Sequence, residues 1–161
     1  MSLLHWEDFV VGSVARYGPR TITREEIVAF AQEFDPQPMH ADEEAARATM
    51  MGGLVASGWH ICALQMRMIA DGFILASSAM GSPGVEEAKW LKPVRPGDSL
   101  TVRVTVLETR PSNSRPGMGL VKFRYAVLDQ SDACVMTLVS TGMFARRGFT
   151  PASAMASERA R

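Results

Sequence analysis

The pattern of apolar and polar positions changes its period along the chain. From residue 84 onward apolar and polar residues alternate, as where Val102 and Val104 flank Arg103. A period of two is typical of β-strands with one buried face. The alternation and the turn residues between its runs predict strands at residues 85–91, 99–109, 120–128 and 134–144. We expect them to pair antiparallel, because the connections between them are short.

The first part of the chain carries helical signals instead. Thr23, followed three residues later by Glu26, forms a capping box, and apolar residues then recur at helical spacing. These features predict a helix at residues 24–34. The residues up to about Tyr17 are short and mixed, and they allow either a strand or a loop beside a ligand.

Two prolines shape the segment after this helix. Pro36 and Pro38 cannot continue a helix, because proline lacks the amide donor and restricts the residue before it. We therefore expect an extended loop at residues 35–41. Asp42 can then cap a second short helix that ends near Ala48.

A third helix is predicted after Ser57, which stands at the N-cap position before Gly58. Apolar residues dominate the stretch from Trp59 to Leu75, so we expect this helix to be buried in the core. It is too short and carries too many polar residues to span a membrane.

One apolar helix followed by a long antiparallel sheet with one apolar face predicts an α+β fold. The simplest way to bury both is for the sheet to curl around the helix, which is the hot-dog fold. We expect one such domain at residues 1–147 and a tail of little predicted order at residues 148–161.

Composition narrows the classes of partner. The 161 residues hold 17 Lys and Arg and 17 Asp and Glu, so no basic surface for nucleic acid or an anionic membrane is predicted. The N-terminus lacks the pattern of a secretory signal, and we expect a cytoplasmic protein. Cys62 and Cys134 lie in apolar runs, where we interpret them as small core residues without a disulfide.

Three segments together resemble the MaoC-like dehydratase family, which includes (R)-specific enoyl-CoA hydratases. They are residues 30–42, 52–58 and 89–98. The first places Asp35 five residues before His40, as the family's hydratase motif does. The resemblance covers residues 21–144 and implies the same hot-dog fold.

The resemblance also implies a chemistry and a site. Asp35 and His40 would share one water and activate it for addition to an enoyl thioester, carried on CoA or an acyl carrier protein. The amide of Gly58, at the positive end of the buried helix, would hold the thioester oxyanion. No cofactor is expected, and a role in fatty acid metabolism follows.

Residues flanking the pair are expected to bind the substrate. They are Phe34, Gln37, Pro38, Met39, Ser57 and Trp59. At three of these positions the chain departs from the family, which often has glycine or serine at Phe34, asparagine at Gln37 and histidine at Ser57.

Each of these assignments has a structural alternative. A lone histidine is more often a hydrogen-bonded structural residue than a catalyst, and an aspartate before proline is a common turn former. Trp59 and Trp90 can line an acyl tunnel or simply fill the core. The three histidines lack ligand spacing, so we expect no metal site.

Two other functions are compatible with this fold. One is an acyl-CoA thioesterase, because hot-dog folds host both reactions. The other is a non-catalytic module that binds acyl thioesters. The family resemblance further implies a homodimer or higher homo-oligomer, with each active site near the subunit interface.

Overall fold

The computed structural model describes residues 3–149. Its elements comprise a curved sheet, four α-helices, a 3-10 turn (η1) and a π-helical turn (η2). In chain order they are η1 (Trp6–Asp8), β1 (Val14–Thr21), α1 (Arg24–Phe34), α2 (Pro38–Ala41), α3 (Glu43–Arg47), α4 (Gly58–Ile69), η2 (Ala70–Ile74), β2 (Ala79–Trp90), β3 (Ser99–Pro111), β4 (Met118–Leu128) and β5 (Cys134–Ala145).

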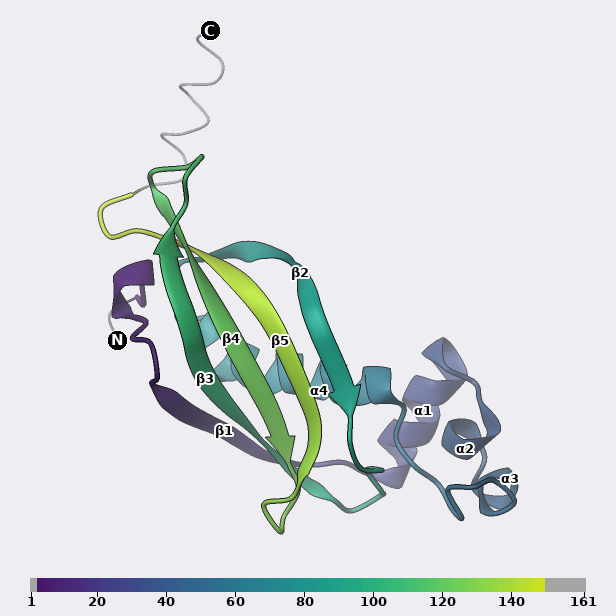
Figure 1. Ribbon diagram of the computed structural model, residues 1–161. Coiled ribbons are helices and arrows are strands. Elements are labelled where there is room, and N and C mark those ends of the chain that lie inside the picture. The colour runs from purple at the N-terminus through teal and green to yellow at the C-terminus, as the bar shows by residue number, and fades with distance from the viewer. Residues whose placement is uncertain (1–2, 150–161) are drawn as a thin grey trace, which may run out of the picture.

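The five strands form one antiparallel sheet in the order β1-β3-β4-β5-β2. It curves across the front of α4, and α1, α2 and α3 gather near one end of that helix (Figure 1). This arrangement confirms the predicted hot-dog fold. The two edge strands, β1 and β2, are the first two strands of the chain.

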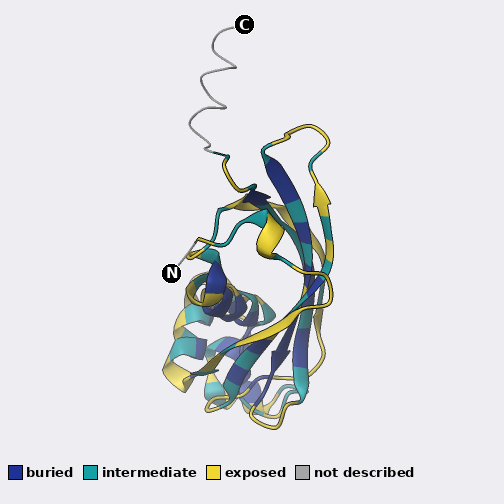
Figure 2. Ribbon diagram, turned by 90° about the vertical axis from the view of Figure 1, so that its left-hand side faces the viewer, coloured by how far each residue is buried: buried dark blue, intermediate teal, exposed yellow. Residues whose placement is uncertain are grey.

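The core lies between the inner face of the sheet and α4. The alternating residues of β3 and β4 meet in register there, with Val104 opposite Tyr125 and Val106 opposite Phe123, and all four are buried. Burial alternates along most of β3 and the middle of β4, as the period of two predicts, whereas the last four residues of β4 are all buried (Figure 2). Leu64 packs into the same cluster from α4.

One face of α4 is uncovered, contrary to the prediction of a fully buried helix. Trp59 and Met66, which are two turns apart on one side of α4, remain 62% and 48% exposed. The sheet covers the opposite side of the helix, and among residues 3–149 these two apolar side chains on the outer side are only partly covered, Trp59 by the ring of Trp90.

Both edge strands differ from the sequence prediction. β2 begins at Ala79, six residues before the predicted start, because its glycines and Pro83 sit in bulged positions rather than in a turn. An edge strand tolerates bulges and proline, since one side of its backbone needs no partner. β1 settles the open choice near the N-terminus as a strand, also with an irregular register.

The helical segment before α4 agrees with the prediction except at one point. α1 has its predicted bounds and its Thr23–Glu26 capping box, and Asp42 caps α3 through the amide of Ala45. The predicted extended loop is wrong from Pro38 onward, where the short helix α2 begins. Proline is favoured at the first position of a helix, because that amide has no partner there anyway.

The predicted tail lies almost wholly outside the described residues. Of residues 148–161, only Gly148 and Phe149 fall within them. Among residues 3–149, no helix is long and apolar enough to cross a membrane.

Candidate functional site

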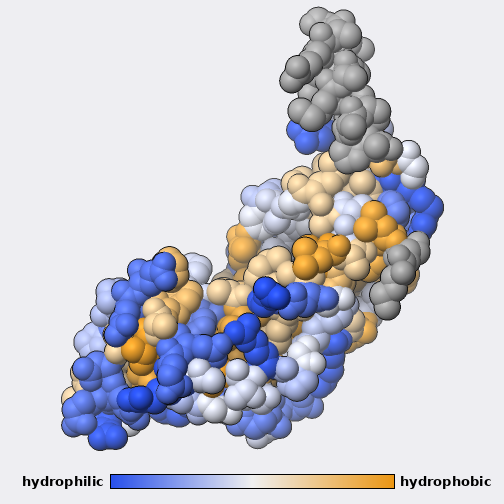
Figure 3. All heavy atoms as spheres, turned by 180° about the vertical axis from the view of Figure 1, so that it is seen from behind, coloured by the Kyte–Doolittle hydropathy of each residue, from blue (hydrophilic) through white to orange (hydrophobic). Residues whose placement is uncertain are grey.

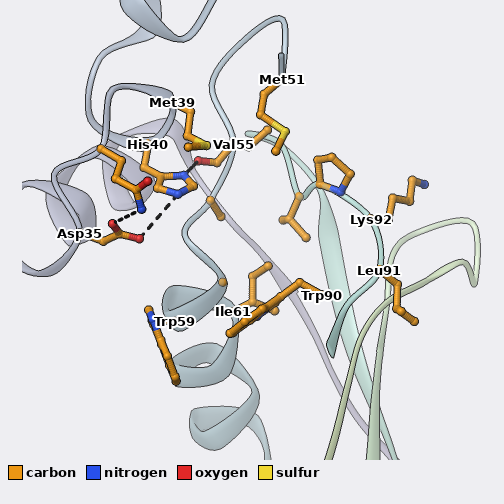
Figure 4. A pocket seen from close by; sticks show the side chains of 15 residues that line it. Asp35, Met39, His40, Met51, Val55, Trp59, Ile61, Trp90, Leu91 and Lys92 are labelled. Atoms are coloured by element: carbon orange, nitrogen blue, oxygen red, sulfur yellow. Dashed lines mark hydrogen bonds and ion pairs between the residues drawn. The ribbon is translucent and has the colours of Figure 1, made fainter. Parts of the chain in front are cut away.

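A pocket of about 370 Å³ opens where α1, α2 and the start of α4 meet the end of β2. Its wall is mainly apolar; Asp35 and His40 lie on one side of it and Lys92 on the other (Figure 4). The lining residues are Asp35, Gln37, Met39, His40, Met51, Val55, Ala56, Gly58, Trp59, Ile61, Trp90, Leu91, Lys92, Pro93 and Val94.

Asp35 ends α1 and presents its carboxylate to the pocket. The side-chain amide of Gln37 donates from Nε2 to Oδ1 at 2.7 Å, and the hydroxyl of Ser57 donates to Oδ2 at 2.6 Å. The hydrogen bond from Ser57, and then that from Gln37, lowers the pKa of Asp35 below its ordinary value, against the opposing effect of burial. Asp35 is therefore a carboxylate at neutral pH and acts there as a hydrogen-bond acceptor.

His40 is buried on α2, and the nitrogen of its ring that faces away from Asp35 is hydrogen-bonded to the backbone. Nδ1 lies 2.8 Å from the carbonyl oxygen of Val55. A carbonyl only accepts, so Nδ1 carries the proton of the neutral ring and Nε2 is left with a free lone pair. The carbonyl of Val55, in the segment before α4, thus sets the tautomer of His40.

The two side chains face each other across a gap. Nε2 of His40 lies 3.6 Å from Oδ2 of Asp35, which is too long for a direct hydrogen bond (Figure 4). Oδ2 of the Asp35 carboxylate and Nε2 of the neutral His40 ring are both acceptors. A water molecule that donates a hydrogen to each therefore fits this geometry better than a direct contact.

The start of α4 brings a backbone donor to the same pocket. Ser57 is the N-cap and accepts from the amide of Trp59 at 3.3 Å. The amide of Gly58 lines the pocket and has no hydrogen-bond acceptor among residues 3–149. Such an amide carries part of the positive end of the helix dipole, which suits a developing negative charge.

The structure brings most of the predicted site residues together. Asp35, Gln37, Met39, His40, Gly58 and Trp59 all line the pocket. Ser57 is fully buried behind the wall, where it holds both Asp35 and the start of α4.

Two further predicted substrate-binding residues, besides Ser57, do not line the pocket. Phe34, in the last turn of α1, is 65% exposed and packs against Phe30 with the two rings tilted at 48°. Pro38 begins α2, where it shapes the backbone rather than the wall.

The opposite wall was largely missed by the sequence analysis. It comes from the end of β2 and the segment that follows it, residues 90–94. Trp90 had been weighed as a possible tunnel residue, but nothing in the local pattern places residues 91–94 beside Asp35. Their position depends on the pairing of β2 with β5, which brings Trp90 opposite Met136.

Basic residues are few at this pocket. Lys92 lines it and pairs with Asp129 at 2.5 Å, while Arg95 lies nearby and donates to the carbonyl of Met51. Arg110 and Arg115 lie at the other end of the sheet, near the hairpin between β3 and β4. Within the described part of the chain, no group of three metal-ligating side chains is found.

The sequence matches a known family over most of its length. The model of the MaoC like domain matches residues 10–122. Protein YdeM of Bacillus subtilis, which is uncharacterised, is 32% identical over 113 residues, 70% of this chain and 79% of its own. A mesaconyl-CoA hydratase of Cereibacter sphaeroides is 28% identical over 88% of this chain, which corresponds to 41% of that longer protein.

Solved structures agree with the fold. A MaoC-like dehydratase from Rhodospirillum rubrum superimposes with a TM-score of 0.84 at 40% identity, covering 91% of this chain and 99% of that one. The (R)-hydratase PhaJ1 from Pseudomonas aeruginosa gives a TM-score of 0.74 at 25% identity, covering 90% and 88%.

Proposed function

The chain belongs to the MaoC-like family, and from this premise we propose that it is a hydratase or dehydratase acting on an enoyl thioester, with CoA as the favoured carrier. The observation that carries the proposal is the gap between Asp35 and His40, in which two acceptors face each other at the mouth of an apolar pocket. Named hydratases among the relatives and solved structures support it.

The geometry suits the activation of one water. Asp35 Oδ2 and His40 Nε2 each accept a hydrogen from it, which aims an oxygen lone pair into the pocket. The imidazole is by nature a stronger base than an aspartate, and the pKa of Asp35 is lowered further by Ser57. We therefore assign the water's proton to Nε2 of His40.

In the addition of water, His40 takes up one proton and later returns it, so no further acid or base is needed. As the water oxygen bonds to the β carbon of the enoyl group, its proton passes to His40, and the electron pair of the double bond moves toward the thioester carbonyl. The amide of Gly58 stabilises the resulting negative charge. The imidazolium of His40 then gives its proton to the α carbon, and the neutral ring is restored. Dehydration is the reverse of these steps.

The test follows loss of the enoyl-thioester absorbance of crotonyl-CoA beside an assay for released thiol. We expect absorbance to fall without thiol release. Asp35→Asn and His40→Ala should each lower kcat by about 100-fold to 10,000-fold, because each removes one of the acceptors that orient the water. Asp71→Asn is the matched control, since Asp71 is exposed in η2, pairs with Arg67 and does not line the pocket.

Each other outcome points to a different function. Release of free thiol would identify a thioesterase. If neither signal changes with crotonyl-CoA or longer enoyl-CoAs, yet acyl-CoA binds equally well to the wild type and the double variant, the domain is a binding module.

A further inference from the structure

The indole of Trp90 stands directly against the start of α4. A methyl group built on Cα of Gly58 would lie 2.4 Å from Cε2 and 2.5 Å from Nε1 of Trp90, so only glycine leaves room for the ring. Trp59 meets the same ring edge-on, with centroids 5.4 Å apart and planes at 74°. Trp90 therefore lies against both the proposed oxyanion donor and a second indole, and Figure 4 shows the two indoles on the same side of the pocket.

The inner wall of the pocket is formed by residues of the hydrophobic core. Ile61 and Val94 line the pocket and are 3% and 0% exposed. One turn along α4, the thiol of Cys62 contacts the sulfur of Met136, which is fully buried. An acyl group bound at Gly58 therefore meets packed side chains rather than an opening.

No tunnel continues along α4 in the described part of the chain. A smaller cavity of about 160 Å³ lies at the far end of the helix, near Phe73, and shares no lining residue with the pocket. Leu64 and Met68, which lie along α4 between Ile61 and Phe73, belong to the packed core and are 5% and 6% exposed. A long acyl chain cannot pass from one cavity to the other.

We infer that the pocket takes a short, compact apolar acyl group, and that Trp90 is the residue that sets this limit. The inference rests on the proposed function, since it assumes that the thioester carbonyl lies at the Gly58 amide. Trp90 lies beside that amide and forms a large apolar part of the pocket wall there, and Trp59 contacts its ring. Removing the indole would enlarge the pocket beside Gly58 and leave room for a longer acyl group.

The experiment compares kcat/KM for crotonyl-, hexenoyl- and octenoyl-CoA in the wild type, Trp90→Ala and Trp90→Leu. For the wild type we expect kcat/KM to fall by about tenfold or more from crotonyl- to octenoyl-CoA, because a closed pocket rejects each added methylene. In the Trp90 variants the ratio of octenoyl- to crotonyl-CoA should rise by about tenfold, in line with the same methylene effect. Leu75→Ala, an exposed apolar residue outside the pocket, should leave the ratio unchanged.

A binding measurement separates this inference from the proposed reaction. Calorimetric titration with butyryl- and octanoyl-CoA needs no turnover, and circular dichroism checks that each variant is folded. If no enoyl-CoA reacts, yet the wild type prefers butyryl-CoA and Trp90→Ala loses that preference, the reaction is refuted and the inference stands. Equal use or binding of short and long chains by the wild type, an unchanged preference in both Trp90 variants, or no acyl-CoA binding at all would overturn the inference.

Discussion

The carboxylate of Asp35 is held by two donors that reach it from different parts of the chain. Gln37 comes from the adjacent turn, whereas Ser57 comes from the cap of α4, 22 residues away. Ser57 therefore links the charge state of Asp35 to the start of the helix whose Gly58 amide is the proposed oxyanion donor. One hydroxyl serves both parts of the proposed site.

Ser57→Ala should shift the acid side of the pH–rate profile. The hydrogen bond from Ser57 is the main cause that lowers the pKa of Asp35, so its removal raises that pKa. The ionised carboxylate, and with it kcat/KM, is then lost at a higher pH as the solution is acidified. Loss of the cap should also lower the free energy of unfolding by about 1 kcal/mol.

Two companion variants sharpen this measurement. Gln37→Ala removes the second cause and should move the acid limb in the same direction by a smaller amount. Ser13→Ala removes an exposed hydroxyl that bonds only within its own turn, and its profile should match that of the wild type. An acid limb that stays in place in Ser57→Ala would show that Asp35 does not need to be ionised.

Among the elements, α1 was predicted to the residue because its signals are local. The capping box of Thr23 and Glu26 begins it, and Pro36 prevents it from continuing past Asp35. The same local reasoning failed at α2 and at the start of β2. Pro38 begins a helix there, and the glycines of β2 lie in bulges at the edge of the sheet. Proline and glycine are also typical of turns, and only contacts with residues distant in sequence decide which structure forms.

The candidate site divides in the same way. The sequence predicts Asp35 and His40 from their five-residue spacing and Gly58 from its place at the start of the apolar helix. The wall from the end of β2 was not found, since it reaches the pocket only through the pairing of β2 with β5. The Ser57–Asp35 contact likewise requires the packing of α1 on α4, although the cap itself was predicted.

The cap of α1 gives a prediction for the element. Thr23→Ala removes the hydroxyl that accepts from the amide of Glu26 at 3.2 Å. We expect the free energy of unfolding to fall by about 1 kcal/mol, measured by urea denaturation. Thr23→Ser keeps the hydroxyl and should recover most of that loss. Equal destabilisation by both variants would mean that the methyl group, not the cap, matters.

At the scale of the whole molecule, β2 leaves one side of a twelve-residue strand unpaired. The uncovered face of α4 lies next to it, since Trp59 contacts Trp90. Met66 and Val85 are also exposed on these two elements, and apolar side chains gather over the middle of the surface seen from behind (Figure 3). An open edge beside an apolar face favours association. We propose that two copies pair through β2 and α4.

Sedimentation tests this pairing. The wild type should sediment as a dimer at micromolar concentration, and Met66→Glu should shift it toward the monomer, because a charge would be buried without a partner. Val10→Glu makes a similar change at another exposed apolar residue, away from β2 and α4, and should remain dimeric. A monomeric wild type, or a Met66→Glu variant that dimerises as well as the wild type, would contradict the proposal.

The indole of Trp90 also makes the pocket optically visible. The chain has three tryptophans, and Trp59 and Trp90 both line the pocket, whereas Trp6 lies at the other end of the sheet against Gly119. Trp90 is 45% exposed, so a ligand that displaces water from its ring should move the fluorescence emission to shorter wavelength. The protein thus carries its own reporter of pocket occupancy, and stopped-flow fluorescence can time ligand entry separately from the chemical step.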